Sequence, residues 1–199
     1  MSDHYLHLQN MRRTIKGQLP PAAQFTAADA TLIGQHSQLL LSWSDELVQG
    51  FYNTLYAHGP TSEIFQEGER PAREQTLAQW WQRVAAGPID DQFWDWMTFV
   101  GLVHVVRKVK NPMMIGAWGF VEGELGKRIK AALPADEAFA LTEAFARFGK
   151  TFNALIAESY VIHYLEAVAE STGSSSVLLD RLVMTEIGTM LENVKPQFR

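Results

Sequence analysis

The chain has 199 residues, a formal net charge of -5 and 47% hydrophobic residues. This length suits one domain with a full hydrophobic core, and a mildly acidic balance excludes a general attraction for nucleic acid. The absence of cysteine excludes disulfides, iron–sulfur clusters and thiolate zinc sites.

A polar N-terminal extension, residues 1–24, is predicted to end at Pro20 and Pro21. It lacks the apolar core of a signal peptide, and the chain has no run of about 18 apolar residues that could span a membrane. We therefore expect a cytoplasmic protein with no membrane segment and no nucleic-acid partner.

Two helices are predicted after the extension. Residues 26–29 read Thr-Ala-Ala-Asp, a capping pattern that starts a helix running to about Leu41. Ser44 can cap a second helix, whose apolar residues follow the 3.6-residue period until Gly59 and Pro60 end it.

A third and a fourth helix follow the loop at residues 60–70. The third begins after Pro71 and stops at Gly87. The fourth starts at Asp90 or Asp91 and runs to about Lys110. One stripe of this fourth helix contains Met97, Val100, Gly101 and His104.

The remaining sequence predicts a fifth helix from Pro112 to about Leu133 and a very long sixth helix from Pro134 to about Ser171. Residues 173–176 form a short flexible joint. The last segment is amphipathic, with an apolar face of Val177, Leu178, Leu182, Ile187 and Leu191. No alternating strand pattern is present, so the chain predicts an all-α fold, for which a helix bundle and a globin-like packing both fit.

Among the six histidines, His104 has the most apolar surroundings. It is flanked by two apolar residues on each side, and Arg107 follows within one turn. A neutral imidazole in an apolar wall is a good axial ligand for haem iron, and an adjacent cation can meet a haem propionate. On spacing alone, a packed core histidine and a solvated basic helix end are the commoner interpretation.

A wider pattern surrounds this histidine. The segment Phe99–His104 is followed by Gly-Ala-Trp, which starts at Gly116, 12 residues after His104. Upstream, Tyr52 belongs to a Phe-Tyr pair, and Thr76 lies between Gln and Leu. Over about residues 25–170 this combination resembles the globin-coupled sensor family, which includes aerotaxis-transducer globins and protoglobins.

The resemblance implies a globin-like fold that binds haem b, with His104 as the iron ligand and the hydroxyls of Tyr52 and Thr76 on the ligand side. It implies a gas sensor for oxygen, which also takes carbon monoxide and nitric oxide. The full set of expected cofactor-binding residues is Phe51, Tyr52, Phe65, Thr76, Leu77, Trp80, Met97, Val100, His104, Arg107 and Met114.

The corner before the fifth helix departs from the family pattern. Met113 and Met114 stand where the family has an aromatic pair. Gating by a tyrosine at this corner is therefore not expected, whereas methionine still packs well on a flat apolar ring.

The resemblance further divides the chain into the extension (1–24), a globin-like haem domain (25–172) and a C-terminal helix or linker (173–199). It implies a homodimer through the last two globin helices, for which the sixth helix offers the stripe Phe145, Phe148, Phe152, Leu155 and Ile156. A downstream signalling domain or protein would receive the output.

Two alternatives to a sensor remain open. The first is a haem enzyme that acts on nitric oxide, oxygen or peroxide, although the chain carries no reductase domain. The second is a haem-free globin-fold regulatory module. We expect any catalysis to be secondary to sensing.

Overall fold

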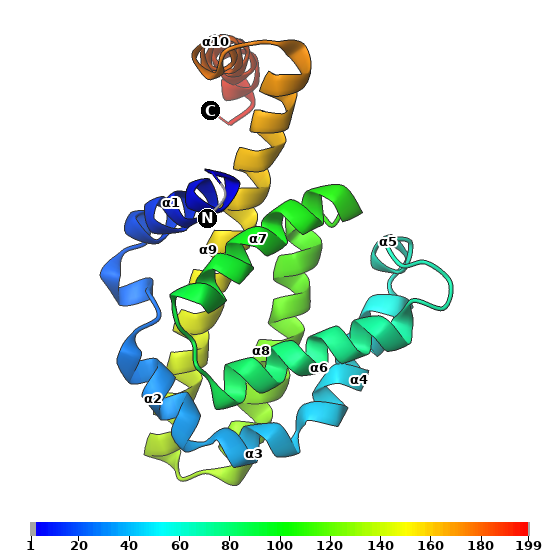
Figure 1. Ribbon diagram of the computed structural model, residues 1–199, viewed down its shortest axis with the longest axis vertical. Helices are drawn as coiled ribbons and strands as arrows, with labels where there is room; N and C mark the ends of the chain where they lie inside the picture. Colours follow the sequence, from blue (N-terminus) through cyan, green and yellow to red (C-terminus); the bar gives the residue numbers. More distant parts are fainter. Residues whose placement is uncertain (1–2, 199) are drawn as a thin grey trace. The chain divides into compact units, whose positions relative to one another are not determined.

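The computed structural model describes residues 3–198, and helices form nearly all of this range (Figure 1). No strand occurs in these residues, so the all-α prediction is confirmed. No helix in the same range is long and apolar enough to cross a membrane. The α-helices are α1 (Asp3–Gln18), α2 (Ala27–Gln35), α3 (Ser37–Ser42), α4 (Ser44–Ala57), α5 (Gly59–Ser62), α6 (Arg70–Ala86), α7 (Asp91–Arg107), α8 (Asn111–Ala132), α9 (Ala135–Thr172) and α10 (Ser176–Val194), with 3-10 helices at Pro21–Ala23 and Lys195–Phe198.

Local capping explains several helix boundaries. The side chains of Thr26 and Asp29 bond each other's backbone N–H groups in a full capping box at the start of α2. Asp90 caps α7 by accepting a hydrogen bond from the Phe93 N–H at 2.9 Å. The prediction that Ser44 caps α4 was wrong, because Ser44 is the first helical residue and Trp43 occupies the cap without a side-chain bond.

The N-terminal extension is helical and packs on α7, which sequence reasoning missed. Leu8, Met11 and Ile15 are buried at helical spacing along one face of α1. The buried Arg12 donates through Nε to Asp95 of α7 at 2.6 Å. The mean hydropathy of this segment is low, and its few apolar residues form a stripe that is recognisable only when α7 is packed against it.

The chain divides into two units, one ending at Tyr160 and one beginning at Val161. An aromatic cluster lies at the core of the first unit, where Phe148 of α9 is fully buried. Its ring lies 5.6–6.5 Å, centroid to centroid, from those of Phe25, Trp80, Phe93, Trp94, Trp118, Phe145 and Phe152.

The predicted dimer stripe on α9 was wrong. Phe145, Phe148, Leu155 and Ile156 are at most 2% exposed, and Phe152 lines an internal cavity. Helical period identifies which residues share a face, but this face meets α7, α8 and the rest of the aromatic cluster rather than a second chain.

Helices α7 and α9 approach each other closely at Gly101. A Cβ atom at this position would lie 2.7 Å from the carbonyl oxygen of Ile156 and 2.9 Å from the backbone nitrogen of Tyr160. The Ser159 hydroxyl on α9 donates to the carbonyl of Thr98 on α7 at 2.9 Å. Gly101 therefore lets α7 lie directly on the α9 backbone, one turn before His104.

Candidate functional site

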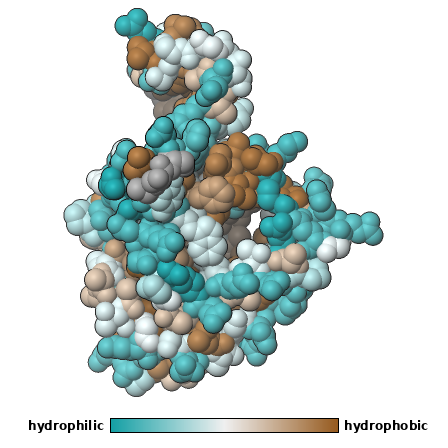
Figure 2. Space-filling view, viewed as in Figure 1, coloured by the Kyte–Doolittle hydropathy of each residue, from teal (hydrophilic) through white to brown (hydrophobic). Residues whose placement is uncertain are grey.

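A cavity of about 410 Å³ opens in the first unit, bounded mainly by α4, α6, α7, α8 and α9. In Figure 2 the molecule is hollowed beside a hydrophobic patch over the C-terminal half of α7. All eleven residues that the sequence singled out line this cavity: Phe51, Tyr52, Phe65, Thr76, Leu77, Trp80, Met97, Val100, His104, Arg107 and Met114. The structure thus brings together side chains from 64 positions of sequence, residues 51–114.

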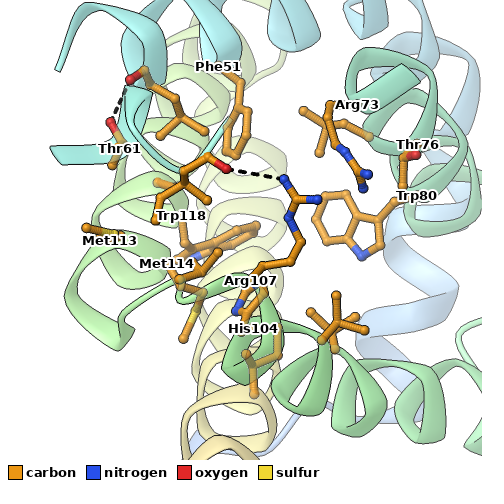
Figure 3. Close-up of a pocket in the computed structure, with 18 of the residues that line it drawn as sticks. Phe51, Thr61, Arg73, Thr76, Trp80, His104, Arg107, Met113, Met114 and Trp118 are labelled. Atoms are coloured by element: carbon orange, nitrogen blue, oxygen red, sulfur yellow. Dashed lines mark hydrogen bonds between the residues drawn. The ribbon is translucent and has the colours of Figure 1, made fainter. Parts of the chain in front are cut away.

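His104 lines the cavity from the last turn of α7 (Figure 3). Burial in the apolar wall, reinforced by the Arg107 cation, lowers the pKa of the imidazole to about 4. The ring is therefore neutral at physiological pH. Its Nδ1 atom is buried and has no hydrogen-bond partner among the described residues.

An unpartnered ring nitrogen in a protein interior is unusual, because buried polar atoms nearly always have partners. A histidine that ligates a metal usually donates its other ring N–H to a backbone carbonyl, a carboxylate or a water. That bond is absent here. A neutral imidazole with an unsatisfied nitrogen, set in an apolar cavity, is chemically suited to a metal-bearing cofactor with a flat apolar body.

Apolar and aromatic side chains make up most of the cavity wall. On α6, Trp80 is held by a hydrogen bond from Nε1 to the Met97 sulfur at 3.4 Å. Trp96 and Phe99, on α7, line the cavity and remain 36% and 46% exposed. Such exposed aromatic rings at the edge of a cavity offer an apolar contact surface to a large flat ligand.

Sequence reasoning missed four aromatic residues of the cavity: Trp96 and Phe99 on α7, Trp118 on α8 and Phe152 on α9. Trp118 belongs to the Gly-Ala-Trp motif, which could have identified it, and its ring lies against Gly149 of α9. Phe152 lines the cavity as well, although its position on α9 had suggested the dimer stripe.

Arg107 spans the cavity edge and is paired with Glu69, a partner that the sequence did not predict. Its guanidinium lies 2.7 Å and 2.8 Å from the two carboxylate oxygens. It also donates to the carbonyl of Ile64 at 3.4 Å, the hydrogen bond drawn from Arg107 in Figure 3. Arg73, also on the cavity wall, donates through Nε to the same carboxylate at 2.6 Å.

This cluster changes the titration of Glu69. Hydrogen bonds from Arg107, from the Gln66 N–H and from Arg73 lower the pKa of the carboxyl to about 2. Two cations and one carboxylate leave a net positive charge at the edge of an otherwise apolar cavity, which suits an anionic ligand group.

The two expected ligand-side hydroxyls are both engaged with backbone carbonyls. Tyr52, buried on α4, donates to the carbonyl of Arg73 at 2.9 Å, and burial raises its pKa to about 12. Thr76 donates to the carbonyl of Ala72 in its own helix at 2.9 Å and lies at the exposed rim of the cavity. Either hydroxyl must leave a carbonyl before it can donate to a ligand.

Comparison with protein-family models matches residues 18–166 to Protoglobin. No curated protein matches the chain. The match spans α2 to α8 and most of α9, and so includes every residue that lines the cavity; α10 lies beyond it.

Proposed function

From the premise that this chain belongs to the protoglobin family of haem-binding, gas-binding globins, we propose that it is a haem-based gas sensor with oxygen as its main signal. In this proposal His104 would hold the iron of haem b, and a homodimer would transmit the signal. The observation that carries it is His104 itself, a neutral imidazole with an unpartnered buried nitrogen in the wall of an apolar cavity.

The cavity residues fit haem b in size, polarity and charge. A volume of about 410 Å³ lies within the usual range for small-molecule and cofactor sites. Because the chain has no cysteine, a thioether-linked haem is excluded and non-covalent binding is required. The net positive charge of Arg73 and Arg107 with Glu69 matches a pair of propionates.

Each group on the wall then has a distinct role. His104 would supply a nitrogen ligand to the iron, while the rings of Phe51, Phe65 and Trp80 would exclude water from the cofactor. Arg107 would bind a propionate in exchange for part of its contact with Glu69. Haem iron supplies the reversible binding of oxygen, carbon monoxide or nitric oxide.

The signal has a direct mechanical route through the fold. His104 and Gly101 lie on the same helix, and Gly101 contacts the α9 backbone at Ile156 and Tyr160. Helix α9 is continuous from Ala135 to Thr172 and therefore passes the boundary between the two units. A shift of α7 on gas binding would move α9, which would favour one of two arrangements of the dimer.

Replacement of His104 tests the proposal. We expect His104→Ala to abolish the Soret absorption of the haem-loaded protein, because no other cavity residue offers an equivalent neutral nitrogen ligand. The measurement is the absorption spectrum of the purified variant after haem addition and removal of unbound haem.

The matched control is His58→Ala, which changes an exposed histidine outside the cavity. It should keep the wild-type spectrum. A His104→Ala spectrum indistinguishable from wild type would exclude His104 as the ligand, and a wild-type protein that retains no haem would favour the haem-free module.

A further inference from the structure

Helix α10 is long and carries one continuous apolar side, although the exposed Leu178 and Leu182, which the sequence had placed on the apolar face, lie on the opposite side of the helix. None of its 19 residues is buried. Its N-terminus is properly capped, since the Ser175 hydroxyl accepts a hydrogen bond from the Leu178 N–H at 3.2 Å. An isolated helix of about this length is only marginally stable in water, so α10 needs a partner for its apolar side.

The apolar side is continuous along the helix. At 100° per residue, seven apolar positions fall within an arc of about 140°. Six of them are between 45% and 70% exposed. These six, which we call the α10 face, are Val183, Met184, Ile187, Met190, Leu191 and Val194, and the seventh is Leu179.

The α10 face is large enough for a stable interface. With Val177 and Phe198 at its edges, it exposes on the order of 700 Å² of apolar surface, close to the roughly 800 Å² that each partner contributes to a typical stable complex. Soluble monomers rarely leave so large a contiguous apolar area uncovered.

Two charged residues near the ends of the α10 face indicate which partner it binds and in which relative orientation. Asp180 is an exposed acidic residue that falls within the arc of the α10 face. Lys195 follows the face at its other end, where a loose, exposed ion pair with Glu192 at 3.8 Å would be exchanged for the contact with Asp180. Asp180 lies seven residues before Ile187 and Lys195 lies eight residues after it. If a second α10 runs antiparallel with Ile187 at the centre, each Asp180 meets the Lys195 of the other copy. A parallel pair would instead align Asp180 with Asp180 inside an apolar seam, which is unfavourable.

Such end-to-end complementarity is the property of a surface that pairs with itself about a two-fold axis. We propose that α10 pairs antiparallel with the α10 of a second copy of this chain, about a two-fold axis at Ile187. This pairing would be the interface of the homodimer in the proposed function. It rests on the proposed homodimer and is independent of haem binding.

A charge exchange in the full-length protein tests the pairing. Each dimer contains two Asp180–Lys195 contacts, so Asp180→Lys or Lys195→Asp should weaken self-association about tenfold. The double variant, Asp180→Lys with Lys195→Asp, should return to within about twofold of wild type. Sedimentation equilibrium gives the dissociation constants. Thr185→Lys is the control, since it adds a cation on the side of α10 opposite the α10 face and should leave association unchanged.

Disulfide cross-linking tests the direction. The chain has no cysteine, so a single introduced cysteine has no competing thiol. Ile187→Cys should cross-link under mild oxidation because the two copies meet at the axis. Val177→Cys should not, because antiparallel pairing separates the two introduced thiols by about 30 Å, far beyond the reach of a disulfide.

The outcomes separate this proposal from the haem site. Cross-linking at both positions would overturn the antiparallel pairing. A monomer, or a dimer that neither forms the Ile187→Cys cross-link nor responds to the charge exchange, would overturn the α10 interface and assign the face to its own globin unit or to another protein. Every α10 variant should keep the wild-type Soret spectrum, whereas failure of the haem proposal would leave the cross-linking result unchanged.

Discussion

At the scale of single residues, Tyr52 and Thr76 offer hydroxyls to the same cavity under different constraints. Tyr52 bonds the carbonyl of Arg73 on another helix, so rotation of its ring or a shift of α6 can free the hydroxyl. Thr76 bonds the carbonyl of Ala72 within its own helix and sits at the exposed rim. The first contact can be exchanged for a ligand, while the second belongs to the helix.

We expect Tyr52→Phe to raise the oxygen dissociation rate of the haem-loaded protein about fivefold. Tyr52 must give up its bond to the Arg73 carbonyl before it donates to a ligand, so the net stabilisation of a polarised ligand is about 1 kcal/mol. Carbon monoxide, which is less polarised, should respond much less. Stopped-flow dissociation of both gases measures the difference.

Thr76→Val serves as the comparison in the same measurement. Its oxygen dissociation rate should stay within about twofold of wild type because the hydroxyl is satisfied by Ala72. An oxygen rate unchanged in Tyr52→Phe would assign Tyr52 to packing only. A large effect of Thr76→Val would show that Thr76 leaves its helix carbonyl.

Glu69 provides a pH-dependent test of the charge cluster at the cavity edge. Its folded-state pKa of about 2 lies below the ordinary value of about 4.3. The carboxylate therefore stabilises the fold at pH values above about 4.3, and this contribution is lost as the pH falls through about 2. At pH 7 we expect Glu69→Gln to lower the free energy of unfolding by about 1 kcal/mol or more.

The difference in the free energy of unfolding between wild type and Glu69→Gln should become progressively smaller when urea unfolding is repeated from pH 5 towards pH 2.5. Glu67→Gln, an exposed substitution in the same loop, should change the free energy of unfolding only slightly at pH 7. If the difference in unfolding free energy between wild type and Glu69→Gln stayed constant over the pH range, the ion pairs of Glu69 with Arg107 and Arg73 would contribute nothing to stability.

At the scale of elements, the contact between α7 and α9 sets the position of the His104 helix. Gly101 is the residue that permits this contact, because a side chain there would meet backbone atoms of α9. We expect Gly101→Ala to lower the free energy of unfolding by about 2 kcal/mol and to weaken haem retention, since α7 must move away from α9. Urea unfolding and haem transfer to apomyoglobin measure the two effects.

Gly119 on α8 gives the matched control. A Cβ atom there has no neighbour within 4 Å, so Gly119→Ala should stabilise the protein by about 0.5–1 kcal/mol through helix propensity alone. Equal effects of the two substitutions would contradict a close helix contact at Gly101.

At the scale of the whole molecule, the cavity belongs entirely to the first unit. Its last lining residue is Ile156, whereas the second unit begins at Val161. We expect a chain that ends at Thr172 to keep its haem spectrum and its thermal midpoint within about 2 °C of wild type, because α10 contributes no buried residue. The same truncation should weaken self-association by at least tenfold, as measured by sedimentation.

A truncated protein that loses haem would contradict this separation and would imply that the second unit supports the cavity. Truncation without any change in self-association would place the dimer contact on the globin unit instead. The two readouts therefore locate the two functions independently.

The sequence by itself determined most of the long helices and a central set of the cavity residues. Caps such as the Thr26–Asp29 box, breakers such as Gly87, and the 3.6-residue period are local signals, so α4 and α6 to α9 could be predicted to within a few residues. The single helix predicted to run to about Leu41 is wrong at its end, because the structure divides it into α2 and α3. All eleven predicted site residues line one cavity, and the predicted family is confirmed by the protoglobin match. The roles of those residues toward haem and gas stay predictions.

Only the tertiary structure decided which surface each helix face meets. Periodicity placed Phe148 and Phe152 on a common stripe of α9, but it could not distinguish a core and a cavity from a dimer interface. Charge partners were equally hidden, because Arg12 meets Asp95 across 83 residues and Arg107 meets Glu69 across 38. Ion pairs, close packing at Gly101 and the hydrogen bond of Tyr52 depend on distances between helices, and those distances are set by the packing of the whole core rather than by any local pattern.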